Sequence, residues 1–242
     1  MIGTLTNVGA VLAGSAIGAA AGSRFPDRFR ETIMAALGLV TMTIGIRETL
    51  ASDEFPLVLG AVLLGTVLGE ALRIEAGLES FGAMLQRRFT PGDGIHIDVD
   101  APETAVPVRG RAGFAEGFVI ASLVFCVGPL LIVGSIEDGL GNPDLLLVKA
   151  ALDGFASIAF ASVYGWGVAA SVIPIILLQG GIALGAGALE GVLTEPMLAA
   201  LGTAGGILLL GIALRLLDLK KVRVANMLPA IVLAPLFVRW WG

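Results

Sequence analysis

Long apolar segments alternate with short polar segments along the whole chain. Each apolar segment approaches the 20 residues that a helix needs to cross the hydrocarbon core of a bilayer. Within these segments apolar and polar residues do not alternate, which disfavours the strands of a membrane β-barrel. The pattern predicts an all-α membrane protein, a polytopic helical bundle of about eight transmembrane spans, at residues 3–22, 32–51, 56–74, 114–136, 145–167, 172–191, 196–216 and 224–241.

Polar and helix-breaking residues separate these spans. The weakest break is Tyr164-Gly-Trp166-Gly, where a turn is predicted because residues 145–191 are too long for one crossing. The longest connection, residues 84–112, is predicted as a cytoplasmic loop between spans three and four. The whole chain, residues 1–242, is interpreted as a single integral-membrane domain.

The composition agrees with a membrane protein and argues against one class of binding partner, nucleic acids. Only 14% of the residues are charged and the mean hydropathy is +0.92, whereas soluble domains carry about 25% charged residues. The net charge of −5 argues against a nucleic-acid partner, so the bilayer is the expected surrounding. No basic segment precedes the first apolar run, which favours a first span over a removed signal peptide.

Basic residues are distributed unevenly between the two sides of the predicted bundle. With eight spans, 12 of the 15 Lys and Arg residues fall on the side opposite the N-terminus. Because cytoplasmic loops of membrane proteins are enriched in Lys and Arg, both termini are predicted to lie outside the cytoplasm.

Glycines repeat along the chain. Gly9, Gly14 and Gly18 of span one align with residues 60, 65 and 69 of span three, and spans one and two resemble spans six and seven. The second likeness would relate units of opposite orientation, an inverted repeat of the kind found in secondary transporters. The plainer alternative is that small residues let helices pack closely, and glycine-rich faces would also suit a homo-oligomer.

Lys149 and Asp153 lie four residues apart inside the fifth span, and therefore on one helix face. At about 1.5 Å per residue, Lys149 is about 6 Å deep and can extend its ammonium to the outer interface. Asp153 is about 12 Å deep and its side chain is too short to do so. Two interpretations stay open: an ion pair that neutralises itself at a helix contact, or a carboxylate that lines a cavity and binds a proton or a cation.

Four further polar residues are candidates for transport or binding. Glu70 lies in the inner half of span three, where pairing with Arg73 is the structural alternative. Glu116 lies about one turn into span four, where the helix dipole alone favours a carboxylate. Gln179 in span six and Asn7 in span one are suited to line a solute path, or simply to join helices by hydrogen bonds.

Two other features affect the predicted chemistry. Gly128-Pro129 interrupts span four and indicates either a kink or an unwound segment that serves a site. His96 lies near Asp93, Asp98 and Asp100, but the spacing matches neither a calcium loop nor a zinc motif. Neither a metal site nor a cofactor is predicted.

Several segments together resemble a known family. They are Met1-Ile-Gly-Thr-Leu-Thr-Asn7, Gly69-Glu70, Glu116-Gly-Phe, Leu152-Asp153-Gly-Phe and Asn226-Met-Leu-Pro. The chain resembles, over nearly its whole length, the YqgA/YdfK-like family of bacterial inner-membrane proteins, a domain-of-unknown-function family. The resemblance implies a bacterial plasma-membrane location and brings no substrate and no assigned residues.

These observations favour a transporter or channel for an ion or small solute, with Asp153 and Glu116 as binding or coupling carboxylates. The alternative is a membrane assembly or sensory subunit that transports nothing. An enzyme is not expected, because the sequence contains no HExxH, GxSxG or P-loop motif.

Overall fold

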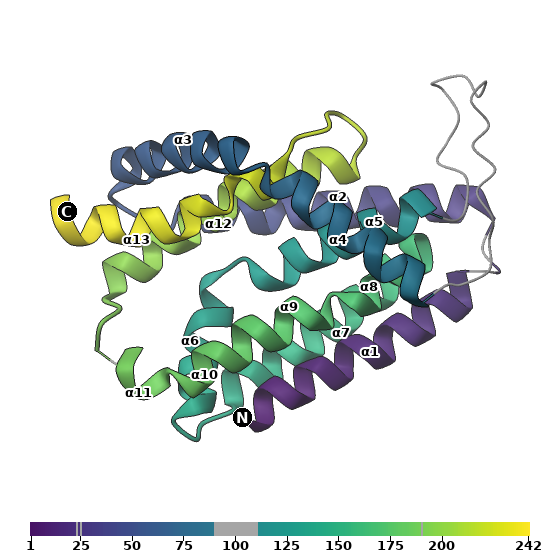
Figure 1. The fold of residues 1–242 in the computed structure, drawn as a ribbon, viewed down its shortest axis with the longest axis horizontal. Helices are drawn as coiled ribbons and strands as arrows, with labels where there is room; N and C mark the ends of the chain where they lie inside the picture. Colours follow the sequence, from purple (N-terminus) through teal and green to yellow (C-terminus); the bar gives the residue numbers. More distant parts are fainter. Residues whose placement is uncertain (23, 25, 90–110, 190) are drawn as a thin grey trace.

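The computed structural model describes residues 1–22, 24, 26–89, 111–189 and 191–242, and regular structure in these ranges is helical (Figure 1). In chain order the elements are α1 (Ile2–Gly22), α2 (Asp27–Thr49), α3 (Phe55–Leu72), α4 (Ile74–Phe89), α5 (Arg111–Cys126), α6 (Pro129–Gly139), α7 (Asp144–Tyr164), α8 (Gly167–Ala170), α9 (Val172–Ile175), the π-helical η1 (Ile176–Gly180), α10 (Gly181–Leu184), α11 (Ala186–Leu189), α12 (Glu195–Leu216), the 3₁₀-helical η2 (Val224–Met227) and α13 (Pro229–Trp241).

Among the described residues, seven helical segments are long and apolar enough to cross a membrane. They are α1, α2, α3, α7, α12, the interrupted segment Gly167–Leu184, and η2 with α13. An eighth candidate is the pair formed by α5 and α6, which is bent by 67° at residues 127–128. The all-α, polytopic fold predicted from the sequence is therefore confirmed.

The bent pair crosses the whole bundle and does not return to the side on which it began. Helices α1 and α7 are antiparallel, with Gly3 beside Leu146 at one end and Gly22 beside Ser162 at the other. Near its start α5 packs Gly117 against Tyr164, at the second end. The last turn of α6 reaches Gly3 and Thr4, at the first end. With this pair counted as one span, the described residues contain eight candidate crossings, an even number that agrees with the eight spans predicted from the sequence.

Glycines set the closest helix contacts. A Cβ atom at Gly14 would overlap Ser157 of α7, and one at Gly18 would overlap the carbonyl oxygen of Ile158. In α3, Gly65 and Gly69 approach Ala230 and Asn226 in the same way. The second and third glycines of each pattern thus serve close packing, the role that small residues commonly play between membrane helices, whereas a Cβ atom at Gly9 would meet open space. Nothing in these contacts tests the inverted repeat.

The spans form two groups (Figure 1). Helix α1 packs mainly on α7, and α5 and α6 pack on the interrupted segment α8–α11. In the second group, α2 and α13 pack on α12, and α3 packs on α13. Helix α12 joins the groups, with 72% of its membrane window buried, whereas α2 has 17% buried and presents most of its surface outward.

One element departs from the prediction. Residues 74–89 form the amphipathic helix α4, so the loop predicted at 84–112 is wrong for residues 84–89 and 111–112, which are helical. Arg73 adopts a left-handed conformation (φ 52°) that ends α3 before α4 begins. The charged residues of α4 interrupt its apolar positions, so the pattern of apolar runs did not predict a helix there. His96 and its neighbouring aspartates lie outside the described residues.

Candidate functional site

Three of the residues singled out from the sequence meet inside the bundle. Lys149 and Asp153 of α7 are each 7% exposed. The Lys149 ammonium pairs with Asp153 Oδ2, and the Asn7 side chain of α1 donates its Nδ2 hydrogen to the same oxygen at 3.0 Å. Asn7 reaches this oxygen because the glycine face of α1 lies directly on α7. We call Asn7, Lys149 and Asp153 the intramembrane triad.

The triad has unused hydrogen-bonding capacity. The Asn7 Oδ1 atom is buried without a partner. Within the described structure Asp153 Oδ1 accepts no hydrogen bond, and Lys149 uses one of its three N–H donors. A buried polar atom without a partner costs about 1–3 kcal/mol, so the arrangement favours a bound polar species over an empty, sealed contact.

The broken span four packs on the helix that carries Lys149 and Asp153, because both α5 and α6 contact α7, while residues 127–129 lie against Gly202 and Gly205 of α12. Gly128 has φ 138°, a backbone conformation that side-chain-bearing residues rarely adopt, and Pro129 begins α6. The last carbonyl groups of a helix lack amide partners within it, so the C-terminal end of α5 carries negative partial charge at this break.

A second irregular helix lies in span six. Its π-helical turn η1 contains Gln179, which is fully buried and has no partner for its amide nitrogen or its oxygen. This turn packs against α1 and α6, two of the elements that surround the triad. No hydrogen bond joins Gln179 to Asp153 in the described structure, so Gln179 is a separate polar position beside the same helices. Turns of this kind are frequent at functional sites.

Glu116 belongs to a different cluster, at the end of the bundle where α12 finishes. Arg215 Nη1 donates to Glu75 Oε1 at 2.8 Å, and its Nε lies 3.5 Å from Glu116 Oε1. Glu75 Oε2 accepts the Ala225 backbone N–H at 2.8 Å. These bonds tie α4, α5, α12 and η2 together, and we call Glu75, Glu116 and Arg215 the inner cluster. Sequence reasoning missed Glu75 and Arg215, because each reads as an ordinary interfacial charge.

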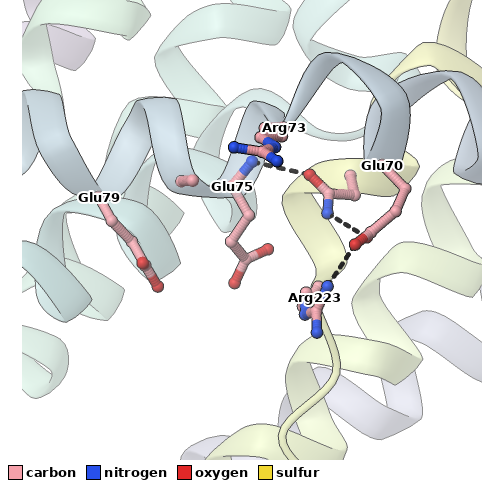
Figure 2. Close-up of a pocket in the computed structure, with 7 residues that line it drawn as sticks. Glu70, Arg73, Glu75, Glu79 and Arg223 are labelled. Atoms are coloured by element: carbon pink, nitrogen blue, oxygen red, sulfur yellow. Dashed lines mark hydrogen bonds and ion pairs between the residues drawn. The ribbon is translucent and has the colours of Figure 1, made fainter.

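Glu70 lies next to the inner cluster and lines a pocket of about 430 Å³ (Figure 2). Its carboxylate pairs with Arg223 and accepts a hydrogen bond from Asn226 Nδ2 at 2.6 Å. The expected alternative, a pair with Arg73, is therefore wrong: the partner comes from the segment before η2. Asn226 Oδ1 also accepts the backbone N–H of Glu75 at 2.8 Å, which links the pocket to the cluster.

At the opposite end, Asp138 of α6 caps the first turn of α1. It accepts hydrogen bonds from the backbone N–H groups of Gly3 at 2.8 Å and Thr4 at 3.0 Å, and from the Thr4 hydroxyl at 2.9 Å. A carboxylate at a helix N-terminus is favoured by both the free N–H groups and the helix dipole. The sequence analysis did not single out Asp138, because its partner helix is 134 residues away along the chain.

The fold and this site together define a class: a polytopic helical membrane protein with a buried ion pair beside a broken span. The chain belongs to a protein family of unknown function, DUF554, whose model matches residues 2–239.

Two relatives extend over nearly the full length. The chain is 31% identical to the uncharacterized protein YqgA of Escherichia coli (strain K12), covering 99% of this chain and 97% of that one. It is 28% identical to the uncharacterized membrane protein YdfK of Bacillus subtilis (strain 168), covering 98% and 96%. No solved structure matches the chain. The resemblance noticed in the sequence is thus confirmed.

Proposed function

We propose that this protein moves an ion or small solute across the bacterial plasma membrane, with the intramembrane triad as its binding or coupling site. The observation that carries the proposal is the buried Lys149–Asp153 pair, which retains unused hydrogen-bonding capacity beside a broken span. Ionisable groups at this depth are costly and are typical of transport pathways and proton relays. Broken helices are typical of the binding sites of secondary transporters.

The contacts of the two halves of the broken span support a moving part. Helix α6 is held to α1 through Asp138, whereas α5 is held to α12 through the Glu116–Arg215 pair. Gly128 lies between these halves in a conformation that suits glycine. A change of backbone angle there would move α6 with α1 relative to α5, which is the hinge motion that opens and closes many binding sites.

The inner cluster supplies the second closure in this proposal. Arg215 pairs with two carboxylates at the end of the bundle opposite Asp138. The triad therefore lies between two polar contacts, the Asp138 cap of α1 at one end and the inner cluster at the other. Glu116 and Glu70 then act in opening the inner end, and Gln179 contributes to the path. The basic residues of the connecting segments favour the inner end as the cytoplasmic one, with both termini outside.

The test is solute flux in proteoliposomes. Vesicles with the purified protein are placed in gradients of alkali chlorides, gluconates and small neutral polar solutes, and volume change is followed by light scattering. Asp153→Asn is expected to lower the active flux at least tenfold, and Glu116→Gln to lower it less. Asp144→Asn is the matched control, because Asp144 is exposed in the first turn of the same helix. A flux that is equal in all variants contradicts the proposal.

The outward surface of α2 favours a second function, a membrane assembly subunit. Of the glycines of α1 and α3 that were expected to serve a homo-oligomer, Gly14 and Gly18 contact α7, and Gly65 and Gly69 contact α13 and η2 within the chain, whereas Gly9 faces open space. Helix α2, with 17% of its membrane window buried, keeps a large free face for lipid or a partner. The mass of the protein in lipid nanodiscs, together with the flux assay, decides between transport and assembly. A complex with a second protein and no flux would support the assembly role.

A further inference from the structure

The triad is built to hold a positive charge. Lys149 places its ammonium against Asp153 Oδ2, and the Asn7 amide donates to the same oxygen. Two further oxygens, Asp153 Oδ1 and the buried Asn7 Oδ1, have no hydrogen-bond donor in the described structure. Unwound backbone commonly coordinates small cations in membrane transporters, and both halves of the broken span, α5 and α6, pack on α7.

We infer that the Lys149 ammonium occupies a monovalent cation site, and that the protein exchanges an alkali cation for a proton there. This inference rests on the proposed transport function. The alkali cation displaces the ammonium from Asp153 when Lys149 gives up one proton. Before the exchange the site holds a Lys149 ammonium and an Asp153 carboxylate; afterwards it holds a neutral Lys149 amine, the cation on the carboxylate, and one released proton.

The exchange leaves the net charge of the site unchanged at zero. This matters because a charge added to a buried site has a large desolvation cost, whereas swapping one cation for another avoids it. One cation therefore moves against one proton, and the transport is electroneutral at this site. Binding an anion to Lys149 would instead bring it among unpaired oxygen atoms, which repel it.

The other titratable groups around α7 are few. Helix α5 carries Cys126 at its end and Glu116 near its start, where Glu116 pairs with Arg215. Helices α1 and α8 bring no titratable side chain, and α2 carries charge only at residues 27–31 and 47–48, near its ends. Helix α6 brings Glu137 and Asp138, and Asp138 is held by the first turn of α1. The proton exchanged within the membrane is thus assigned to Lys149.

The experiment measures proton release in proteoliposomes that contain a pH-sensitive dye and carry an imposed pH gradient. Li⁺, Na⁺, K⁺ or Rb⁺ is added as the gluconate, with the membrane potential clamped at zero. The wild type is expected to collapse the pH gradient with at least one of these cations. Lys149→Arg keeps the positive charge and the pair but does not release a proton, so the exchange rate should fall at least tenfold.

Asn7→Ala removes one proposed cation ligand and should raise the half-saturating cation concentration about tenfold with a smaller effect on the maximal rate. Lys221→Arg, on an exposed inner segment, is the control and should behave as the wild type. Exchange that survives in Lys149→Arg, or no response to any of the four cations, overturns the inference. If Asp153-dependent flux of another solute persists without cation–proton exchange, the inference fails while the proposed function stands; if no Asp153-dependent flux exists, both fail.

Discussion

Removing one member of the buried pair should destabilise the protein more than removing both. Lys149→Met leaves the Asp153 carboxylate, 7% exposed, with only the Asn7 hydrogen bond. Breaking a buried ion pair by deleting one partner costs about 3–5 kcal/mol, because an uncompensated charge stays buried. Since Asn7 still supplies one hydrogen bond, the loss in the free energy of unfolding is expected at the lower end, about 3 kcal/mol.

The opposite deletion is expected to cost less. In Asp153→Asn the Lys149 ammonium loses its partner, but it lies about 6 Å along the helix from Leu145, near the start of α7, and its long side chain can extend toward that end. The cost should therefore be about 1–2 kcal/mol. The double variant Lys149→Met/Asp153→Asn leaves no unpaired charge buried. Its free energy of unfolding should therefore lie within about 1 kcal/mol of that of the wild type. The resulting coupling free energy is about 3–5 kcal/mol in favour of the pair.

Reversible unfolding by SDS in mixed micelles, followed by circular dichroism, measures these four free energies. Lys220→Met, on an exposed segment after α12, serves as the control for the loss of a lysine. The reasoning is refuted if the effects of the two single variants simply add in the double variant. Additivity would mean that water solvates both groups and that Lys149 and Asp153 do not depend on each other.

Three further predictions concern the backbone around the site. Asp138→Ala should cost about 1–2 kcal/mol and speed hydrogen exchange in the first turn of α1, whereas Glu137→Ala should leave that exchange unchanged. Gly18→Ala should lower the thermal midpoint, because its Cβ would overlap a backbone oxygen of α7 that has no room to move, while Gly9→Ala meets open space and should not; a melting curve in detergent decides. Gly128→Ala also meets open space, yet its φ of 138° should cost about 1–3 kcal/mol, measurable by the same SDS unfolding.

The sequence predicted the features that depend on neighbours along the chain. Span number follows from apolar length, and the Lys149–Asp153 contact follows from the four-residue spacing of one helix turn. Asn7 was singled out as a polar residue at depth, but its bond to Asp153 joins residues 146 positions apart. Such a contact depends on which helices pack together, and nothing in the local pattern of either segment specifies it.

The inner cluster shows the same limit more strongly. Glu75 and Arg215 are 140 residues apart, and each lies where a helix end meets the interface, so each alone looks like a solvated charge. Glu70 was expected to use Arg73, three residues away, but the left-handed turn at Arg73 ends α3. Arg223, 153 residues away, provides the charge instead. Local spacing predicts a partner only while the helix continues.

The repeated glycines and the buried carboxylates are parts of one arrangement. On α1, Gly3, Asn7, Gly14 and Gly18 lie on the face buried against α7, and the short distance between the helices lets a short asparagine reach Asp153. On α3, Gly69 lies against Asn226, and Asn226 reaches the next residue, Glu70. In both places a close helix contact at a glycine brings an asparagine amide within hydrogen-bond distance of a carboxylate. The likeness of spans one and three therefore has a chemical consequence beyond packing: it places one amide–carboxylate bond between α1 and α7 and another where α3 ends.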